Sequence, residues 1–206
     1  TPTIIRPYGS LKIAGPWFNG ELDPVSGNSP TYQAISVNVL DTLVGLTPDA
    51  KQVPGLAERW EISPDGLTQT FWIRKGVKFH NGDDLTGADV KFSIERLLEG
   101  TALNSDAALY RTLVNKVDLI DDYTVAIRLK KPQFELLIGI GDNRGTVAVV
   151  PKKYIEEKGV DYFRKNLVGS GPYRVVNIQP GVSVELEANE SYWNPARMPK
   201  VKNITY

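Results

Sequence analysis

Few residues in this sequence combine the types and the spacing that catalysis requires. His80 is the single histidine, and it stands at an expected strand end before an Asn-Gly turn, where we predict a partly exposed turn residue. A Ser-His-Asp triad would have to use it. Ser170 lies between two glycines but lacks the flanking pattern of a nucleophile elbow. Nucleophilic catalysis is therefore poorly supported.

Two other kinds of site can be weighed from the residues. Residues 139–145 superficially resemble a dinucleotide-binding loop, but the third glycine falls one residue late and no evident amphipathic helix follows. We therefore expect no cofactor. Asp83-Asp84 and Asp121-Asp122 are best explained as turn residues. A carboxylate pair for sugar hydrolysis stays open, because the separation of carboxylates is a property of the folded chain.

The composition excludes further classes. The 206 residues contain no cysteine, so disulfides, thiolate metal sites and cysteine nucleophiles are excluded within them. One histidine cannot form a poly-histidine metal site, and we expect no metal. The 24 Lys and Arg balance 24 Asp and Glu, which gives no net charge. Nucleic-acid binding needs a basic surface, so we expect no such partner.

Hydrophobic residues make up 41% of the chain and charged residues 23%, which is ordinary for a soluble globular protein. Folding should bury roughly 70% of the surface of the unfolded chain, enough for one sizeable core or two small ones. The longest apolar runs are far short of the ~20 residues that span a bilayer. No signal peptide opens the chain, so we expect either a cytoplasmic protein or one whose leader has been removed.

Short strands and helices must position the polar residues. Ser29 is a suitable N-cap with Pro30 at the first helical position. Thr86 is a second N-cap, with Asp89 where a capping box prefers Glu. We predict that Trp60 and Trp72 lie in a core.

The sequence predicts helices over 29–45, 86–98, 107–117 and 151–158. It predicts hairpins over 58–73 and 173–186, the second with its valines on one face. Further strands are expected over 11–14, 123–129, 147–150 and 201–206.

The hairpin region and several later segments carry a specific resemblance. They are similar to the extracellular solute-binding proteins of family 5, which serve oligopeptide, dipeptide and nickel ABC importers. The resemblance extends in order over about residues 8–206. The segments that carry it are Val53–Ser63, Asp65–Thr68, Phe71–Gly82, Leu22-Asp23-Pro24, Leu85–Ser93, Gly169–Tyr173 and Asn189–Pro195.

The resemblance implies an α+β fold, a periplasmic-binding-protein-like lobe with a mixed sheet and a subdomain rich in β-hairpins. Family members have two lobes that enclose a ligand, and the second lobe is absent from this chain. We expect residues 1–31 and 168–206 to form an incomplete ligand-facing subdomain and residues 32–167 an inserted hairpin-and-helix subdomain. The isolated lobe should bind solute weakly or not at all, because half of the enclosing surface is missing.

The resemblance also implies a function. The parent would be a bacterial binding protein, not an enzyme, that takes up an extracytoplasmic solute and delivers it to the membrane permease. A short peptide is the favoured solute, whereas a nickel chelate, an oligosaccharide or an opine stays open because fold does not choose among them. We expect a monomer in the periplasm or at the outer face of the cytoplasmic membrane.

Two groups of residues match the ligand contacts of the family's first lobe. The first is Asn28 and Ser29, with Tyr32 one turn into the helix. The exposed backbone there could pair with an extended peptide. The second precedes the Val-Pro segment and comprises Asn143 and Arg144, next to Asp142. An arginine there could meet a carboxylate.

Plainer interpretations stay open: Ser29 as only an N-cap, and Arg144 as a solvated loop residue. For the whole chain, two alternatives remain. A secreted hydrolase of sugars or peptides would show turnover that is lost when a carboxylate is mutated. A protein-interaction domain would show self-association or a large exposed apolar patch.

Overall fold

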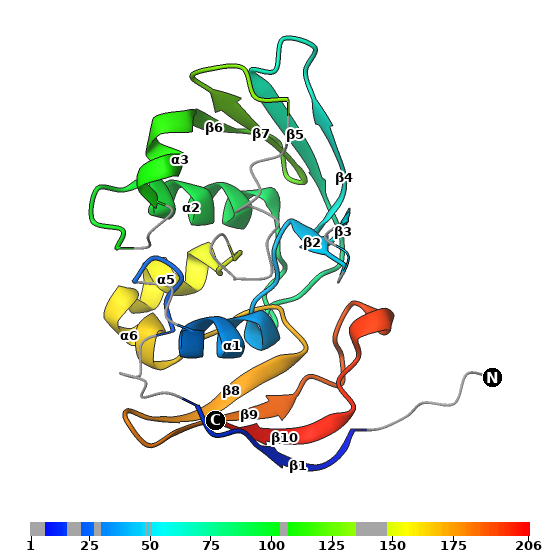
Figure 1. Cartoon of the computed structure of the whole chain (residues 1–206), viewed down its shortest axis with the longest axis vertical. Helices are drawn as coiled ribbons and strands as arrows, with labels where there is room; N and C mark the ends of the chain where they lie inside the picture. The colour runs from blue at the N-terminus through cyan, green and yellow to red at the C-terminus, as the bar shows by residue number, and fades with distance from the viewer. Residues whose placement is uncertain are drawn as a thin grey trace, which may run out of the picture.

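The computed structural model describes residues 7–15, 22–26, 30–47, 49, 51–103, 107–134 and 148–206. Within these ranges two four-stranded sheets lie at opposite ends of the molecule, with helices between them (Figure 1). The lower sheet has the order β1 (Tyr8–Lys12), β10 (Val201–Thr205), β9 (Ser183–Ala188) and β8 (Tyr173–Gln179). The upper sheet has the order β4 (Ala57–Ile62), β5 (Thr68–Ile73), β7 (Thr124–Leu129) and β6 (Val114–Asp121).

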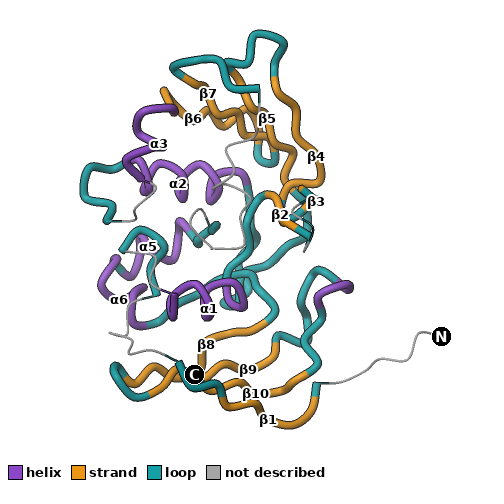
Figure 2. Tube along the Cα trace, in the orientation of Figure 1, coloured by secondary structure: helices purple, strands orange, loops and turns teal. Residues whose placement is uncertain are grey.

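The helices form the middle of the molecule (Figure 2). Near the lower sheet lie α1 (Pro30–Val39), α5 (Lys152–Lys158) and α6 (Val160–Lys165), and near the upper sheet lie α2 (Gly87–Leu98) and α3 (Ala107–Leu113). A small sheet of β2 (Val44–Leu46) and β3 (Gln52–Pro54) and the short helix η1 (Pro195–Arg197) complete the described elements.

Each sheet packs on its own hydrophobic cluster. The upper core contains Phe71, Ile94 and Ile127, all essentially excluded from solvent. The lower core contains Ile35, Phe163 and Leu186. The predicted two-part division of the chain stays a prediction, but its boundaries differ from these clusters, because residues 32–40 and 148–167 contribute side chains to the lower core.

Several predicted elements are confirmed. Helix α1 begins at Pro30, and the hairpins β4–β5 and β8–β9 and the strands β7 and β10 occupy their predicted ranges to within a few residues. At the start of α2, the amide and hydroxyl of Thr86 both donate to the Asp89 carboxylate, at 2.9 and 3.0 Å. The other Asp89 oxygen accepts from the amide of Lys152, so the cap also joins α2 to α5.

The predicted helix over 107–117 is wrong in its second half, because α3 ends at Leu113 and β6 begins at Val114. Val117 is buried against the upper core as a strand residue paired with Ile127. A spacing of four places residues on one helical face, but four is also an even number, so the same residues share one face of a strand. The β-branched side chain and the hairpin pairing with β7 decide between the two.

The helix predicted to end at Gly45 stops at Val39 instead. The amide of Gly171 donates to the Val39 carbonyl at 2.9 Å, which satisfies a terminal helix carbonyl from a distant loop. The chain then continues into β2. A Cβ on Gly171 would lie only 2.6 Å from the backbone of Val39, so this approach requires glycine.

Four smaller predictions also need correction. The first strand is Tyr8–Lys12 rather than 11–14, because it pairs in parallel with β10. The described part of 147–150 is buried but is not a strand, since its amides bond to Asp41 and Ser93. Val182 lies in the β8–β9 turn and is 75% exposed. Trp72 is half-buried on the outer face of the upper sheet, with the Arg59 guanidinium 3.4 Å from its ring centre.

Candidate functional site

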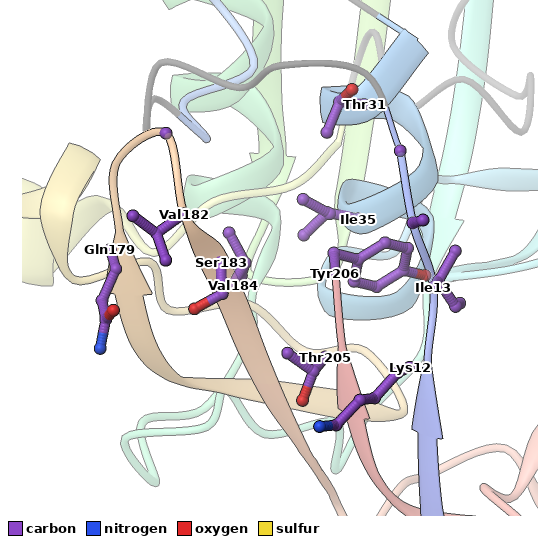
Figure 3. Close-up of a pocket in the computed structure, with 13 residues that line it drawn as sticks. Lys12, Ile13, Thr31, Ile35, Gln179, Val182, Ser183, Val184, Thr205 and Tyr206 are labelled. Carbon is purple, nitrogen blue, oxygen red and sulfur yellow. The ribbon is translucent and has the colours of Figure 1, made fainter.

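A hollow of about 390 Å³ opens at one edge of the lower sheet, and we call it the strand-end hollow. Strands β1 and β10 run parallel, so both reach this edge with their carboxyl ends. Figure 3 shows α1 above the strand ends and the β8–β9 turn at the side. The lining residues are Lys12–Gly15, Thr31, Ile35, Gln179, Gly181–Val184 and Thr205-Tyr206.

The walls of the strand-end hollow are fixed by hydrogen bonds. The amide of Ile13 donates to the Thr205 carbonyl at 2.8 Å, and Val184 and Tyr206 exchange two backbone bonds at 2.9 and 3.0 Å. The Tyr206 hydroxyl donates to the Ala34 carbonyl at 3.1 Å, which ties the strand end to α1. Burial raises the pKa of the Tyr206 phenol. The site is thus a rigid frame around a mostly apolar space.

Polar groups at the rim give the strand-end hollow a positive character. Lys12 is exposed and makes no ion pair with any described residue. Thr31 lies in the first turn of α1, where the helix dipole favours negative charge. In open sheets, ligands bind outside the carboxyl ends of parallel strands. The hollow could therefore hold the carboxylate or carbonyl of a small ligand.

Of the five predicted ligand residues, only Tyr32 lies in the described part. It follows Thr31 in α1 and is 3% exposed within the lower core, so it supports the helix that frames the hollow. The other four, together with Asp142, lie outside the described residues: Asn28, Ser29, Asn143 and Arg144.

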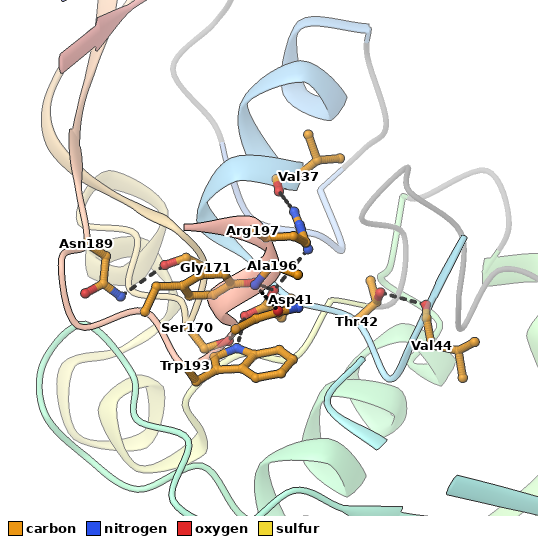
Figure 4. A network of polar contacts seen from close by, with 12 residues as sticks. Val37, Asp41, Thr42, Val44, Ser170, Gly171, Asn189, Trp193, Ala196 and Arg197 are labelled. Carbon is orange, nitrogen blue, oxygen red and sulfur yellow. Dashed lines mark hydrogen bonds and ion pairs between the residues drawn. The ribbon is translucent and has the colours of Figure 1, made fainter. Parts of the chain in front are cut away.

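A buried carboxylate holds the lower region to the segment after β9, as Figure 4 shows. Asp41 is 3% exposed and follows α1. It accepts hydrogen bonds from the Ser170 hydroxyl at 3.0 Å, the Tyr192 hydroxyl at 2.8 Å and the Trp193 ring nitrogen at 2.9 Å. Arg197 adds an ion pair at 3.5 Å. We call this cluster the Asp41 clasp.

The Asp41 clasp was not predicted from the sequence, although the position of Asp41 in an apolar pattern could have indicated a buried carboxylate. Asp41 stands between Leu40 and Leu43 at the end of an apolar helical pattern, and a carboxylate buried there must find donors. The donors come from residues 170–197, more than 120 positions away, which no local pattern reveals. Burial and the Asp41 charge together raise the pKa of the Tyr192 phenol, so this hydroxyl stays a donor.

His80 lies next to the Asp41 clasp, where its ring contacts the backbone on both sides of Ser170 and not the Ser170 hydroxyl. Its Nε2 contacts the Gly171 carbonyl at 2.9 Å, and its Nδ1 accepts from the amide of Gly169 at 3.3 Å. Ser170, between them, donates to Asp41 instead. Burial lowers the pKa of the His80 imidazole, which matches a ring that donates through one nitrogen and accepts through the other.

Asp23 of the Leu-Asp-Pro segment is a second buried carboxylate. Arg96 of α2 binds it through both terminal nitrogens, at 3.1 and 2.7 Å.

The described residues hold no group of three or more potential His, Asp or Glu ligands for a metal. In those same ranges no helix is both long and apolar enough to cross a bilayer.

The sequence and the fold both match one family of known proteins. The model for bacterial extracellular solute-binding proteins, family 5 (middle part), matches residues 51–206. The chain belongs to this family. The glutathione-binding protein GsiB of Pectobacterium atrosepticum is 33% identical over 192 residues. That alignment covers 90% of this chain but only 35% of the relative, so the chain spans about a third of the length of such family members.

Solved structures of family members share the fold. The periplasmic binding protein DppA from Helicobacter pylori, in complex with the peptide STSA, matches with a TM-score of 0.84 and 25% identity over 97% of this chain and 42% of its own. MoaA from A. tumefaciens R10, in complex with mannopinic acid, gives 0.83 and 31% identity, with 96% and 40% covered. The predicted fold, a lobe of a periplasmic binding protein, is confirmed.

Proposed function

We propose that this chain belongs to the solute-binding component of an ABC importer and that the strand-end hollow forms part of its ligand surface. The observation that carries the proposal is a rigid hollow at the carboxyl ends of two parallel strands in a chain of this family. The space is mostly apolar with a few polar groups at its rim, as in ligand sites generally.

A peptide-like solute fits this surface best. The relatives include proteins named for glutathione and structures that contain the peptides STSA and RPPGFSPFR. Such ligands share amide groups and a carboxylate, which suit Lys12 and the first turn of α1. We extend the proposal to Asn28, Ser29 and Tyr32 as one contact group, and to Asn143 and Arg144 as a second that receives a carboxylate.

The strand-end hollow is open, so a ligand bound there needs a second surface to enclose it. A site of this kind encloses little of a ligand by itself, and family proteins of greater length can supply the opposing surface. We propose closure of two lobes around the solute and delivery to the permease, by a monomer in the periplasm or at the outer face of the cytoplasmic membrane. No described group favours the hydrolase or the interaction-domain alternative.

A thermal-shift screen of the full-length gene product tests this function. The pools are short peptides with glutathione, nickel with small chelators, oligosaccharides, and opines. A ligand at ~100 times its Kd adds about 2.7 kcal/mol of stability. We expect a shift with the peptide pool, and isothermal titration should show that Lys12→Gln weakens binding about fivefold or more.

The matched control is Lys202→Gln, an exposed lysine of β10, which should leave the Kd unchanged. A shift only with another pool would correct the solute class. No shift with any pool would contradict the binding function, and equal affinities for the two lysine variants would remove the strand-end hollow from the site.

A further inference from the structure

A second hollow of about 390 Å³ lies between the loop at residues 22–26, the C-terminal half of α2 and the α5–α6 pair. We call it the helix-junction hollow. It shares no lining residue with the strand-end hollow. Two arginines, Arg96 and Arg164, reach it from different helices, and Ser26 reaches it from the loop.

The two arginines share one buried carboxylate. The side chain of Asp23 is 0% exposed and that of Arg96 is 7% exposed, and their two hydrogen bonds make a complete bidentate pair. The Nε of Arg164 lies 3.6 Å from Asp23 Oδ2, which is too long for a hydrogen bond. Arg96 makes both hydrogen bonds to the Asp23 oxygens, so Arg164 keeps only the longer ion pair with this carboxylate.

Among the described residues, two buried donors that line this hollow have no hydrogen-bond partner: Arg164 Nε and the Ser26 hydroxyl. Arg164 also pairs with Asp161 at 3.2 Å, but that carboxylate is 94% exposed and such surface pairs are weak. Buried polar groups are nearly always satisfied, so two unsatisfied donors that line one hollow call for an acceptor from outside. A guanidinium and a hydroxyl that line the same hollow match a carboxylate.

The rim of the helix-junction hollow has the opposite charge. Glu99 and Glu156 line it and are exposed. A free inorganic anion would be repelled by them, whereas a molecule with a carboxylate inside and an ammonium group outside would match both ends. Phe92, Ile155 and Val160 supply apolar walls. We infer that the helix-junction hollow binds a zwitterionic amino acid or short peptide, with its carboxylate on Arg164 and Ser26 and its ammonium group at the two glutamates.

This site goes beyond the proposed import function, because the first lobe alone supplies its groups. The test is an NMR titration of the ¹⁵N-labelled 206-residue chain with alanylalanine. Residues beside the hollow, such as Val25 and Val160, should shift. Arg164→Gln should weaken binding about tenfold or more, and so should the C-terminal amide of the dipeptide, which lacks the carboxylate. N-acetylation of the dipeptide removes the ammonium group and should also weaken binding.

The controls separate the site from folding and from the import function. Ser26→Ala removes only an unpartnered hydroxyl, so it should weaken binding without lowering the melting temperature, whereas Arg174→Gln, an exposed arginine paired with Glu187, should change nothing. Shifts elsewhere, equal affinity for the amide, or unchanged binding by the Ser26 and Arg164 variants would overturn the inference. If the full-length protein binds peptides but alanylalanine binding does not depend on Ser26 and Arg164, the proposed function stands and this site is wrong. If alanylalanine binds at the helix-junction hollow but the full-length protein binds no peptide, this site stands and the proposed function is wrong.

Discussion

The upper sheet and the junction below it are held together by different forces. By the junction we mean the contacts of Asp41, Asp23 and His80 with distant segments. Hydrocarbon side chains fill the space under the upper sheet, and Phe71 on its central strand β5 is completely buried. The junction with the lower region instead relies on Asp41, Asp23 and His80, each bound by groups from distant segments. The stability of the upper sheet should therefore depend on how completely side chains fill its core. The stability of the junction should depend on its hydrogen bonds and on the protonation of His80.

The largest expected effect tests the volume dependence. Phe71→Ala should lower the free energy of unfolding by about 3–5 kcal/mol, because it leaves a cavity in a core that cannot collapse around a central strand. Trp60, its neighbour across β4 and β5, is only half-buried, so Trp60→Ala should cost less than Phe71→Ala. Urea unfolding measures both. A loss below about 1 kcal/mol for Phe71→Ala would show that the core of the upper sheet is not tightly packed.

The next effect tests the dependence on donors. Asp41→Ala should cost about 1–3 kcal/mol, because the Tyr192 hydroxyl and the Trp193 ring nitrogen lose their acceptor. Asp41→Asn keeps one acceptor oxygen and should cost less. Asp49→Ala, an exposed carboxylate, is the control and should be close to neutral. If Asp41→Ala were also neutral, the clasp would not stabilise the junction.

The sequence predicts the two regions unequally well. The alternation in β5 and β7 and the cap at Thr86 are local, so these elements could be placed from neighbouring residues, whereas the start of β6 is wrongly predicted as helix. The junction could not be placed in this way. Its hydrogen bonds join residues 73 to 152 positions apart, and a further bond, between Val39 and Gly171, meets the last residue of α1. The strand-end hollow likewise depends on the pairing of β1 with β10, at opposite ends of the chain.

A smaller effect tests the proton dependence. The pKa of His80 is lowered by burial from 6.5, so below that pH the unfolded chain binds a proton that the folded chain resists. This contribution to stability is complete above about pH 6.5 and is lost as pH falls through the folded pKa. Urea midpoints from about pH 5 to 8 should show this slope, and His80→Gln should flatten it. An unchanged slope in the variant would assign the pH dependence to other groups.

The smallest expected effect lies on the outer face of the upper sheet, where the Arg59 guanidinium stacks on Trp72 at 3.4 Å. This contact is partly exposed, so a double-mutant cycle with Arg59→Gln and Trp72→Leu should give a coupling of about 0.5–1 kcal/mol. Glu61→Gln on the same strand, paired with Trp72→Leu, is the control and should show no coupling. A coupling as large as the loss in Phe71→Ala would break the contrast, because the upper sheet would then depend on a polar contact as much as on its core.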